Sequence, residues 1–369
     1  MMRGPVLENL TAAIVDECRS GLDVDTLRAS VLPRLRRAVP IDALWWASVD
    51  PATLLFTQAY RQQIPAETGP YFVENEFLQD DVNKWTELAR DRDGVRTLVE
   101  STGGEVAKSP RYLDIFRPLG LEDELRAVLR SRGACWGYLC LHREAGQPFT
   151  REETRFVGRL APHLAEGIRL GLLLCSLELS AAADAPGLVL VASDGSVSAT
   201  NEAAGGWLEE LGGTASGSGG PLPIEVYAVA AKLRALDRSQ PSLPRLRVRT
   251  RAGRFALVHA SWLSQQDAGT IAVIIEEAHP LEIAPVIMAA YGLTPRERTL
   301  TGLVCQGLST AEIASRLHLS THTVQDHLKS IFDKTGVRSR RELVVTVLKR
   351  EYLPRTHAGQ PVGSSGFYV

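Results

Sequence analysis

The chain has 369 residues, of which 44% are hydrophobic and 23% charged, and its formal net charge is −2. This length is enough for two to three domains with sizeable cores. Five cysteines, an odd number without a C-x-x-C pair, argue against a disulfide framework and a zinc site and indicate a reducing compartment. No apolar run approaches the about 20 residues that span a bilayer, and the N-terminus lacks the apolar stretch of a signal peptide. We therefore expect a cytoplasmic protein with no membrane partner, metal or cofactor.

The first 178 residues predict an α+β domain. Residues 6–38 have the apolar spacing of two helices, and strand-like runs and short aromatic-rich helical segments follow. A long helix then begins at a capping box formed by Thr150 and Glu153 and continues to about residue 178. Helices around an antiparallel sheet of about five strands make an α+β sensor shell. The strand-like runs are 42–49, 53–59, 123–130 and 134–143.

Apolar residues recur along the long helix at steps of four and three: Leu164, Ile168, Leu172, Cys175 and Leu179. This is the spacing of a seam between two helices. The same stripe would also serve to cover the sheet of its own domain. Both interpretations stay open, and a helix that did both would carry a signal out of the domain.

Aromatic residues concentrate in the first third of the chain, in larger number than a sheet of this size needs for its core. Arg126, inside an apolar strand, could form an ion pair with an acidic group of a small, largely apolar ligand. Taken singly, each aromatic is more often core than pocket, and Arg126 on an exposed strand face would pair with Glu122 or Glu124 instead. The candidate ligand residues are Trp46, Tyr60, Tyr71, Phe72, Trp85, Tyr112, Arg126 and Trp136.

Residues 186–278 predict a second, smaller α+β domain. A strand, a turn at Asp194-Gly195, a second strand and a helix come first. After the glycine-rich segment 212–220, a helix near 224–236 and three further strands follow. The core of this domain is small and aliphatic, which favours a scaffold over a ligand-binding domain.

Start and stop signals divide residues 294–342 into four short helices. Gly307 and Gly336 stand where the first and third helices should end, because glycine adopts the left-handed conformation without a Cβ penalty. A helix within 279–292 precedes this segment as a hinge, and residues 353–369 are expected to form a loosely ordered tail. The capping boxes that mark three helix starts are Thr294 with Glu297, Ser309 with Glu312 and Ser339 with Glu342.

The second helix, at about 310–317, and the third, at about 321–335, meet across the tight turn 318–320. Such a helix-turn-helix presents the N-terminal half of its second helix to base edges in the major groove. For an isolated helix, a solvated polar face would be the plainer interpretation, but here the turn and the caps agree with DNA binding. The third helix has an apolar face, Val324, Leu328, Ile331 and Phe332, and a polar face, His322, Gln325, Asp326 and Lys329.

These motifs resemble the LuxR-type (NarL-type) DNA-binding domain, with its LTPRE start, QGLS bend, TV-x-x-HLK helix and GVRSR turn. Many relatives have lysine at the position of Gln325 and an uncharged residue at that of Asp326. Glutamine can pair with adenine and aspartate can accept from cytosine N4, so we expect a different operator sequence. The resemblance implies base contacts by Gln325, Asp326 and Lys329, beside His322, with Thr321, Thr323, His327, Arg338 and Arg340 near the DNA backbone.

The rest of the chain resembles known sensor folds. The run from LGLEDELRAVL through CWGYLCLHR is similar to GAF domains of actinobacterial LuxR-type regulators, and the strand-DG-strand-N-x-A order of the second domain resembles a PAS fold. The expected protein is therefore multidomain, with two α+β domains and an all-α four-helix domain. Its predicted divisions are a GAF-like domain at 1–178, a PAS-like domain at 186–278, a hinge helix at 279–292, a LuxR-type domain at 293–352 and a tail at 353–369.

The sequence lacks the motifs of a nucleotide-binding loop, a nucleophile elbow, a metalloprotease or a kinase, so no catalytic residue is assigned and no enzyme is expected. Residues 294–351 hold ten basic and six acidic residues, whereas the whole chain is weakly acidic. A basic segment in an otherwise acidic chain indicates that DNA is contacted by this segment alone. We expect a transcriptional regulator that binds double-stranded DNA as a homodimer, with RNA polymerase and a small-molecule effector as candidate partners. The alternatives are a sigma-factor-like promoter-recognition protein and an enzyme with a DNA-binding appendage.

Overall fold

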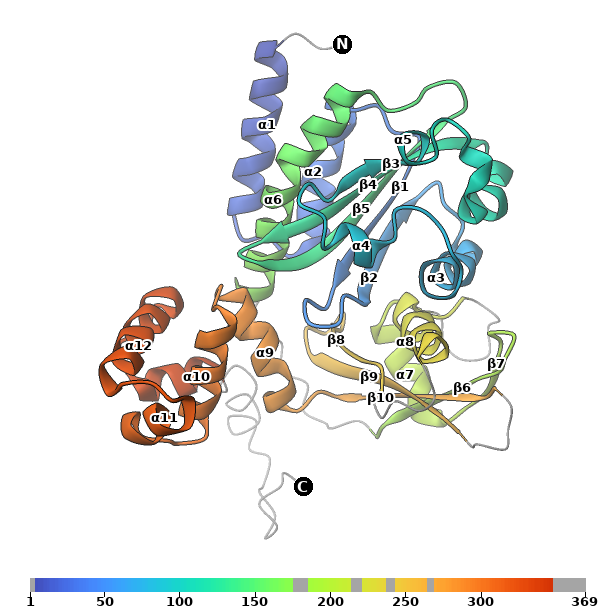
Figure 1. Ribbon diagram of the computed structural model, residues 1–369. Coiled ribbons are helices and arrows are strands. Elements are labelled where there is room, and N and C mark those ends of the chain that lie inside the picture. Colours follow the sequence, from blue (N-terminus) through green and yellow to red (C-terminus); the bar gives the residue numbers. More distant parts are fainter. Residues whose placement is uncertain (1–3, 175–184, 214–220, 237–242, 264–268, 348–369) are drawn as a thin grey trace. The chain divides into compact units, whose positions relative to one another are not determined.

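The computed structural model describes residues 4–174, 185–213, 221–236, 243–263 and 269–347 (Figure 1). The described residues up to Glu277, apart from the turn at 132–134, form one compact unit. Those from Ala278 onward form a second unit. Within the described ranges, no helix is both long and apolar enough to cross a membrane.

The first unit contains a five-stranded sheet in the order β2-β1-β5-β4-β3. β1 lies inside the sheet and pairs antiparallel with β2 on one side and β5 on the other. Four strands match the predicted runs, but β3 was not predicted because three residues are too few to show an alternating pattern. The strands are β1 Ala43–Val49, β2 Phe56–Gln62, β3 Val95–Thr97, β4 Leu121–Ser131 and β5 Ala134–Glu144.

Helices α2 (Val24–Ala38) and α6 (Arg151–Leu174) cover one face of this sheet, and α1 (Gly4–Arg19) packs against both of these helices (Figure 1). The capping box predicted for α6 is confirmed, because the Glu153 carboxylate accepts from the Thr150 backbone N–H and the Glu153 N–H donates to the Thr150 hydroxyl.

The apolar stripe of α6 does cover the sheet, as one of the two interpretations expected. Leu164 and Ile168 are buried, and Leu172 is half-buried. A Cβ at Gly171 would lie 2.4 Å from the Leu22 carbonyl oxygen, so glycine is needed where α6 passes the loop between α1 and α2. Cys175 and Leu179, the other two members of the stripe, lie outside the described residues, and the seam with another helix stays a prediction.

Short helices and connecting loops cover the other face of the sheet. The short aromatic-rich segments predicted from the sequence correspond to α3, α4 and η3, and η3 is a single π-helical turn. The elements on this side are η1 Ala66–Thr68, α3 Gly69–Leu78, α4 Trp85–Leu88, α5 Leu98–Ser101, η2 Val106–Lys108, η3 Tyr112–Phe116 and η4 Arg117–Leu119.

A second five-stranded sheet, in the order β7-β6-β10-β9-β8, repeats the strand order of the first. The predicted strand-turn-strand-helix opening is present, and Asn201 caps α7 by accepting the Ala204 N–H. Its core is small and aliphatic apart from Trp207. The elements are β6 Gly187–Val191, β7 Val197–Thr200, α7 Glu202–Glu210, α8 Ile224–Ala235, β8 Arg245–Arg249, β9 Phe255–Trp262 and β10 Ile271–Glu277.

Helix α8 serves both sheets. Ala228 and Ala231 pack into the aromatic cluster of the first sheet, and Val226 and Val229 pack into the core of the second. A helix that is apolar around most of its circumference is buried on more than one side. The apolar composition of α8 therefore indicates that it packs against two neighbours. The two predicted sensor domains consequently lie in one compact unit.

The second unit is helical. The predicted helices at 310–317 and 321–335 match α11 and α12, and the predicted hinge segment contains α9. Ala284 and Met288 of α9 belong to the core of this unit, while a hinge role for α9 stays a prediction. The predicted tail at 353–369 lies outside the described residues. The helices are α9 Pro280–Ala290, α10 Pro295–Cys305, α11 Thr310–Leu317, α12 Thr321–Thr335 and a last helix at 340–347.

Candidate nucleic-acid interface

Helix α12, the proposed recognition helix, has fixed ends. Ser320 is its N-cap and accepts the Thr323 N–H at 3.0 Å, while the Ser320 and Thr323 hydroxyls lie 2.9 Å apart. Gly336 ends the helix in the left-handed conformation with φ 71°, as predicted. The first turn of α12 therefore has a defined orientation, with two hydroxyls beside the positive end of the helix dipole.

The two predicted faces of α12 are confirmed. Val324, Leu328 and Ile331 are buried in the core of the helical unit, and Phe332 is half-buried against it. Spacing of three and four residues puts them on one side of the helix. The members of the opposite face, Thr321, His322, Gln325, Asp326 and Lys329, are exposed, and the flanking Thr323 and His327 are half-buried.

Asp326, the unusual acidic residue of this face, has a neighbour of its own. The His322 Nδ1 atom lies 3.0 Å from its Oδ2 atom, and the two side chains are 83% and 68% exposed. The His322 ring therefore gives the Asp326 carboxylate a hydrogen-bond partner on the exposed face of α12. The pair also orients the carboxylate near Gln325 on the same face.

The two predicted backbone-contacting arginines differ in their surroundings. Arg338 is exposed. Arg340 is half-buried, and its Nη2 atom donates to the Leu308 carbonyl oxygen at 3.1 Å. Arg340 therefore ties the 340–347 helix to the bend between α10 and α11, a structural role that the sequence did not indicate.

Glu297 anchors α12 to α10. Its carboxylate closes the predicted capping box with Thr294 and also accepts from Lys334 at 2.7 and 2.8 Å and from the Ser330 hydroxyl at 2.7 Å. Burial raises the pKa of Glu297, but these hydrogen bonds outweigh burial and lower the pKa to about 2. The capping role was predictable from local spacing, whereas the contacts with a helix over thirty residues away were not.

The other two predicted capping boxes are confirmed to different extents. Ser309 and Glu312 form a complete box. At the third, the Glu342 N–H donates to the Ser339 hydroxyl, but the Glu342 carboxylate accepts from the Arg338 N–H instead of the Ser339 N–H. The last helix thus begins at the predicted place with a shifted partner.

The turn between α11 and α12 contains a residue in a conformation that favours glycine. His318 has φ 54° at the C-cap of α11, and its side chain is exposed. A side chain in the left-handed region costs about 1–2 kcal/mol. We expect His318→Gly to raise the unfolding free energy of the helical unit by about 1 kcal/mol, measured by thermal melting followed by far-ultraviolet circular dichroism. His318→Ala, which keeps a Cβ, is the control, and equal melting of both variants would contradict the explanation.

Two family models match the chain. The model described as bacterial regulatory proteins of the luxR family matches residues 292–347, and the GAF domain model matches residues 7–168. The spore germination protein GerE of Bacillus subtilis is 42% identical over 57 residues, which make up 15% of this chain and 77% of GerE. The chain belongs to the LuxR family of bacterial regulatory proteins.

Other proteins similar to this LuxR-family chain share less of their length with it. A protein of Mycobacterium bovis named as an HTH-type transcriptional regulator is 47% identical over 58 residues. The matched part is 16% of this chain and only 7% of that protein. Among solved structures, Escherichia coli SdiA is similar at 11% identity with a TM-score of 0.35, over 94% of this chain and 98% of SdiA.

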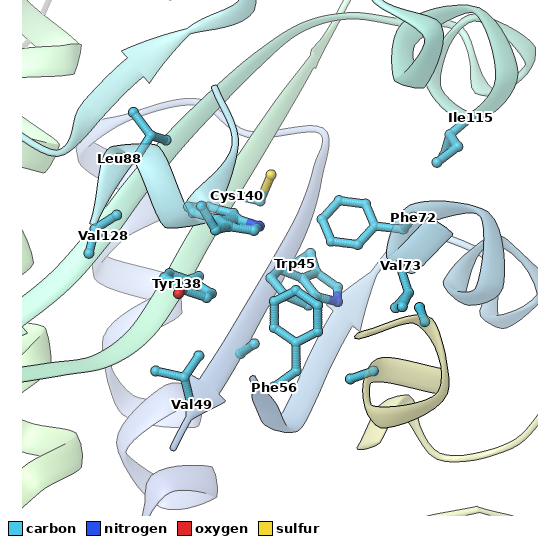
Figure 2. Packing of buried hydrophobic residues seen from close by; sticks show 14 of the residues in the cluster. Trp45, Val49, Phe56, Phe72, Val73, Leu88, Ile115, Val128, Tyr138 and Cys140 are labelled. Carbon is cyan, nitrogen blue, oxygen red and sulfur yellow. The ribbon is translucent and has the colours of Figure 1, made fainter. Parts of the chain in front are cut away.

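The candidate ligand residues of this LuxR-family chain lie in the part matched by the GAF model, but the structure brings only some of them together. Figure 2 shows Phe72 beside Trp45 in a buried aromatic cluster. Trp85 is also buried in this cluster, Arg126 lies over the rings of Phe72 and Trp85, and Tyr112 packs at the edge. The ring centroids of Trp45 and Phe72 are 4.9 Å apart.

The other four candidates lie elsewhere. Tyr71 is 62% exposed. Trp46 follows the cluster residue Trp45 in β1, lies 5.9 Å from the Arg28 guanidinium carbon and faces Tyr60 across the strand pair. Trp136 donates its indole N–H to the Ser131 carbonyl and is outside the cluster. Alternation along a strand explains why neighbours such as Trp45 and Trp46 cannot line one pocket.

Arg126 is neither exposed nor paired with Glu122. It is fully buried, its Nε atom lies 3.1 Å from Glu124 Oε1, and its Nη1 atom lies 3.0 Å from Glu76 Oε2. A third position of the guanidinium, Nη2, has no hydrogen-bond partner among the described residues. The predicted pairing with Glu124 is thus present, but in the interior.

Glu124 and Arg126 belong to a buried ion network that the sequence did not reveal. Arg111, with no exposed side-chain surface, contacts Asp81 at 3.1 Å and Glu124 at 2.7 Å. Burial raises the pKa of the Glu124 carboxyl, but the two guanidiniums outweigh burial and hold that pKa far below its usual value. Nearby His142 is also buried, which lowers its pKa to about 4 despite the attraction of Glu124.

Two cavities of very different volume lie beside the aromatic cluster. A cavity lined by Trp45, Phe72, Phe116 and His142 has a volume of about 20 Å³, room for about one water molecule. An open groove of about 790 Å³ runs past the end of β1, beside Arg36, Asp42 and Glu144 among others. In this conformation the cavity at the aromatic cluster is too small for an organic ligand, so the cluster would have to open to admit one.

Proposed function

We propose that this LuxR-family protein is a sequence-specific DNA-binding transcriptional regulator, and that its GAF domain controls it in response to a small molecule or a partner. The observation that carries the proposal is the exposed polar face of α12 on a capped helix-turn-helix. Family membership supports a regulator over the sigma-factor-like and enzyme alternatives. RNA polymerase is the expected partner in transcription.

Each predicted domain has its own proposed role. Residues 1–178 act as the sensor, residues 186–278 as a PAS-like scaffold, α9 as the hinge and residues 293–352 as the DNA-binding domain. The strand order of the second sheet, which repeats that of the first, supports two related sensor-type folds. An effector would act by binding one state of the sensor more tightly than the other, because only differential affinity shifts an equilibrium.

The roles within α12 are tested by base preference. On an operator selected from random DNA by the full-length chain, Gln325→Ala or Asp326→Ala should alter the preference at one position by roughly 1–3 kcal/mol. Arg338→Ala should weaken binding to all DNA sequences by the same factor. It should also reduce the slope of log affinity against log salt concentration by about 1 per lost phosphate contact. Quantitative binding titrations at several salt concentrations measure both effects. Unchanged affinity and preference for Gln325→Ala would show that α12 does not read the bases.

We further propose that the regulator binds as a homodimer, because one short recognition helix reads too few base pairs. The operator should be a pseudo-palindrome with half-sites about one helical turn, roughly 10 base pairs, apart. Footprinting and light scattering measure these properties, and a monomer with a single half-site footprint would contradict them.

The structure limits which residues can form the dimer contact. From the sequence, Val344, Val347 and Leu348 on the last helix are candidates for this contact. Val347 is only 3% exposed and lies in the core of its own unit, so its side chain is unavailable for a dimer contact. Val344 is half-buried, and Leu348 lies outside the described residues.

A further inference from the structure

Three buried side chains of different chemistry meet on the first sheet. Glu124 comes from β4, and Cys140 and His142 come from β5, two residues apart and therefore on the same face. One carboxylate oxygen, the thiol sulfur and one ring nitrogen all lie within 4.8 Å of one another. The three residues are at most 1% exposed. Figure 2 shows Cys140 at the edge of the aromatic cluster, near Trp45 and Phe72.

His142 is not explained by packing alone. Neither ring nitrogen has a hydrogen-bond partner in the part of the chain that the structure describes, although the ring packs on Phe116 at a centroid distance of 4.5 Å. A buried polar group without a partner destabilises the fold, and such groups are rare. An imidazole with an unused lone pair beside a thiol and a carboxylate is instead suited to bind a metal ion.

The other two side chains are already oriented. The Glu124 Oε2 atom accepts from Arg111 Nε at 3.1 Å and from Nη2 at 2.7 Å, which leaves Oε1 directed at the cluster. Oε1 accepts from Arg126 Nε at 3.1 Å and from the Cys140 thiol at 2.8 Å. Hydrogen bonds from outside the ligand set fix ligating carboxylates in this way in known metal sites. The thiol proton lies where a cation could replace it.

We propose that Glu124, Cys140 and His142 bind a divalent transition-metal ion, zinc in the first place. The ion replaces the Cys140 thiol proton, which leaves to solvent, and a metal–sulfur bond forms in place of the S–H bond. Thiolate, imidazole and carboxylate are the zinc ligands of proteins, and three of them leave a fourth position open. Our expectation from cysteine spacing that the chain has no metal site did not consider ligands of different types on two strands.

A dication at this site would lie among other buried charges. Arg111 and Arg126 would repel it, but Arg111 also pairs with Asp81, and Arg126 also pairs with Glu76. Glu124, Asp81 and Glu76 together balance the charges of Arg111, Arg126 and Lys84, so a dication that replaces the thiol proton adds one positive charge to the cluster. The remaining cation, the Lys84 ammonium, donates to the carbonyl oxygens of Asn75, Glu76 and Gln79 at the end of α3.

Cobalt is the probe, because a cobalt–thiolate bond has a near-ultraviolet charge-transfer band. The full-length chain, stripped of metal by a chelator, is titrated with Co²⁺ and then with Zn²⁺ in competition. We expect one equivalent of Co²⁺ to produce the band and Zn²⁺ to abolish it. Cys140→Ser should remove the band, and Cys135→Ser, a buried cysteine in the same strand outside the ligand set, should keep it.

His142→Phe supplies a second test that does not depend on sulfur. The variant should fold, because the substitution removes two buried nitrogens that have no hydrogen-bond partner. Loss of a ligand should weaken Co²⁺ binding by more than the roughly 10–100-fold that follows when a residue hydrogen-bonded to a ligand is removed. Absence of the band in the unaltered chain, or a band and affinity unchanged in both Cys140→Ser and His142→Phe, would overturn the proposal. The titrations contain no DNA, so either result leaves the proposed regulatory function to its own test.

Discussion

Arg111→Met should lower the unfolding free energy of the first unit by about 3–5 kcal/mol, because it leaves buried carboxylates without their cation. The Asp81 and Glu124 side chains that Arg111 contacts have no exposed surface, and Arg111 also donates to Asn75 and to the Val82 carbonyl. Methionine has a similar volume without the charge, so the loss is electrostatic and not a cavity effect.

Urea unfolding followed by tryptophan fluorescence measures this change. The six tryptophans of the chain, Trp45, Trp46, Trp85, Trp136, Trp207 and Trp262, all precede Ala278, so their signal reports the first unit. Arg117→Met, at an exposed position only six residues away, is the matched control and should change the unfolding free energy by less than about 0.5 kcal/mol. If both variants lost the same unfolding free energy, the buried ion pairs of Arg111 would contribute no more to stability than an exposed arginine does.

The helix-turn-helix could be predicted closely because its signals are local. Ser309 and Glu312 are three residues apart, and Gly336 marks a helix end by its own conformational freedom. The spacing of Val324, Leu328 and Ile331 fixed the buried face of α12, and with it the exposed face.

The interior of the sensor unit could not be predicted in the same way, because its contacts join distant residues. Arg126 contacts Glu76, fifty positions earlier, and no local pattern relates the two. One local signal did exist. Glu124 and Arg126 are two apart in a strand and therefore on one face, where two charges among apolar residues indicate a buried pair.

The candidate ligand residues show the limit of composition as evidence. Counting aromatics grouped Trp46 with Phe72, but strand alternation puts Trp46 on the face opposite Trp45 and its cluster. The polar members that distinguish the interior, Arg111 and His142, were not selected because single charged residues outside strands, or single histidines, are usually unremarkable in a sequence. Their significance arises only from burial.

Glu225 should make the first unit less stable as pH rises. It is 2% exposed in α8, and its Oε2 atom has no hydrogen-bond partner among the described residues. Burial raises its pKa to about 8, from the ordinary value of 4.5 for a glutamate. The unfolded chain therefore loses this proton at a lower pH than the folded one, and stability present below pH 4.5 is lost progressively up to about pH 8 at about 1.4 kcal/mol per pH unit.

Glu225→Gln should consequently stabilise the unit relative to the unaltered chain by about 3 kcal/mol at pH 7, and the advantage should vanish near pH 4.5. Urea unfolding by tryptophan fluorescence at a series of pH values measures the difference. Glu209→Gln, at an exposed position on α7, is the control and should follow the unaltered chain at every pH. Because α8 packs into the cores of both sheets, ionisation of Glu225 would loosen a helix that they share. Parallel curves for Glu225→Gln and the unaltered chain would instead mean that the carboxyl group reaches solvent or a partner when it ionises.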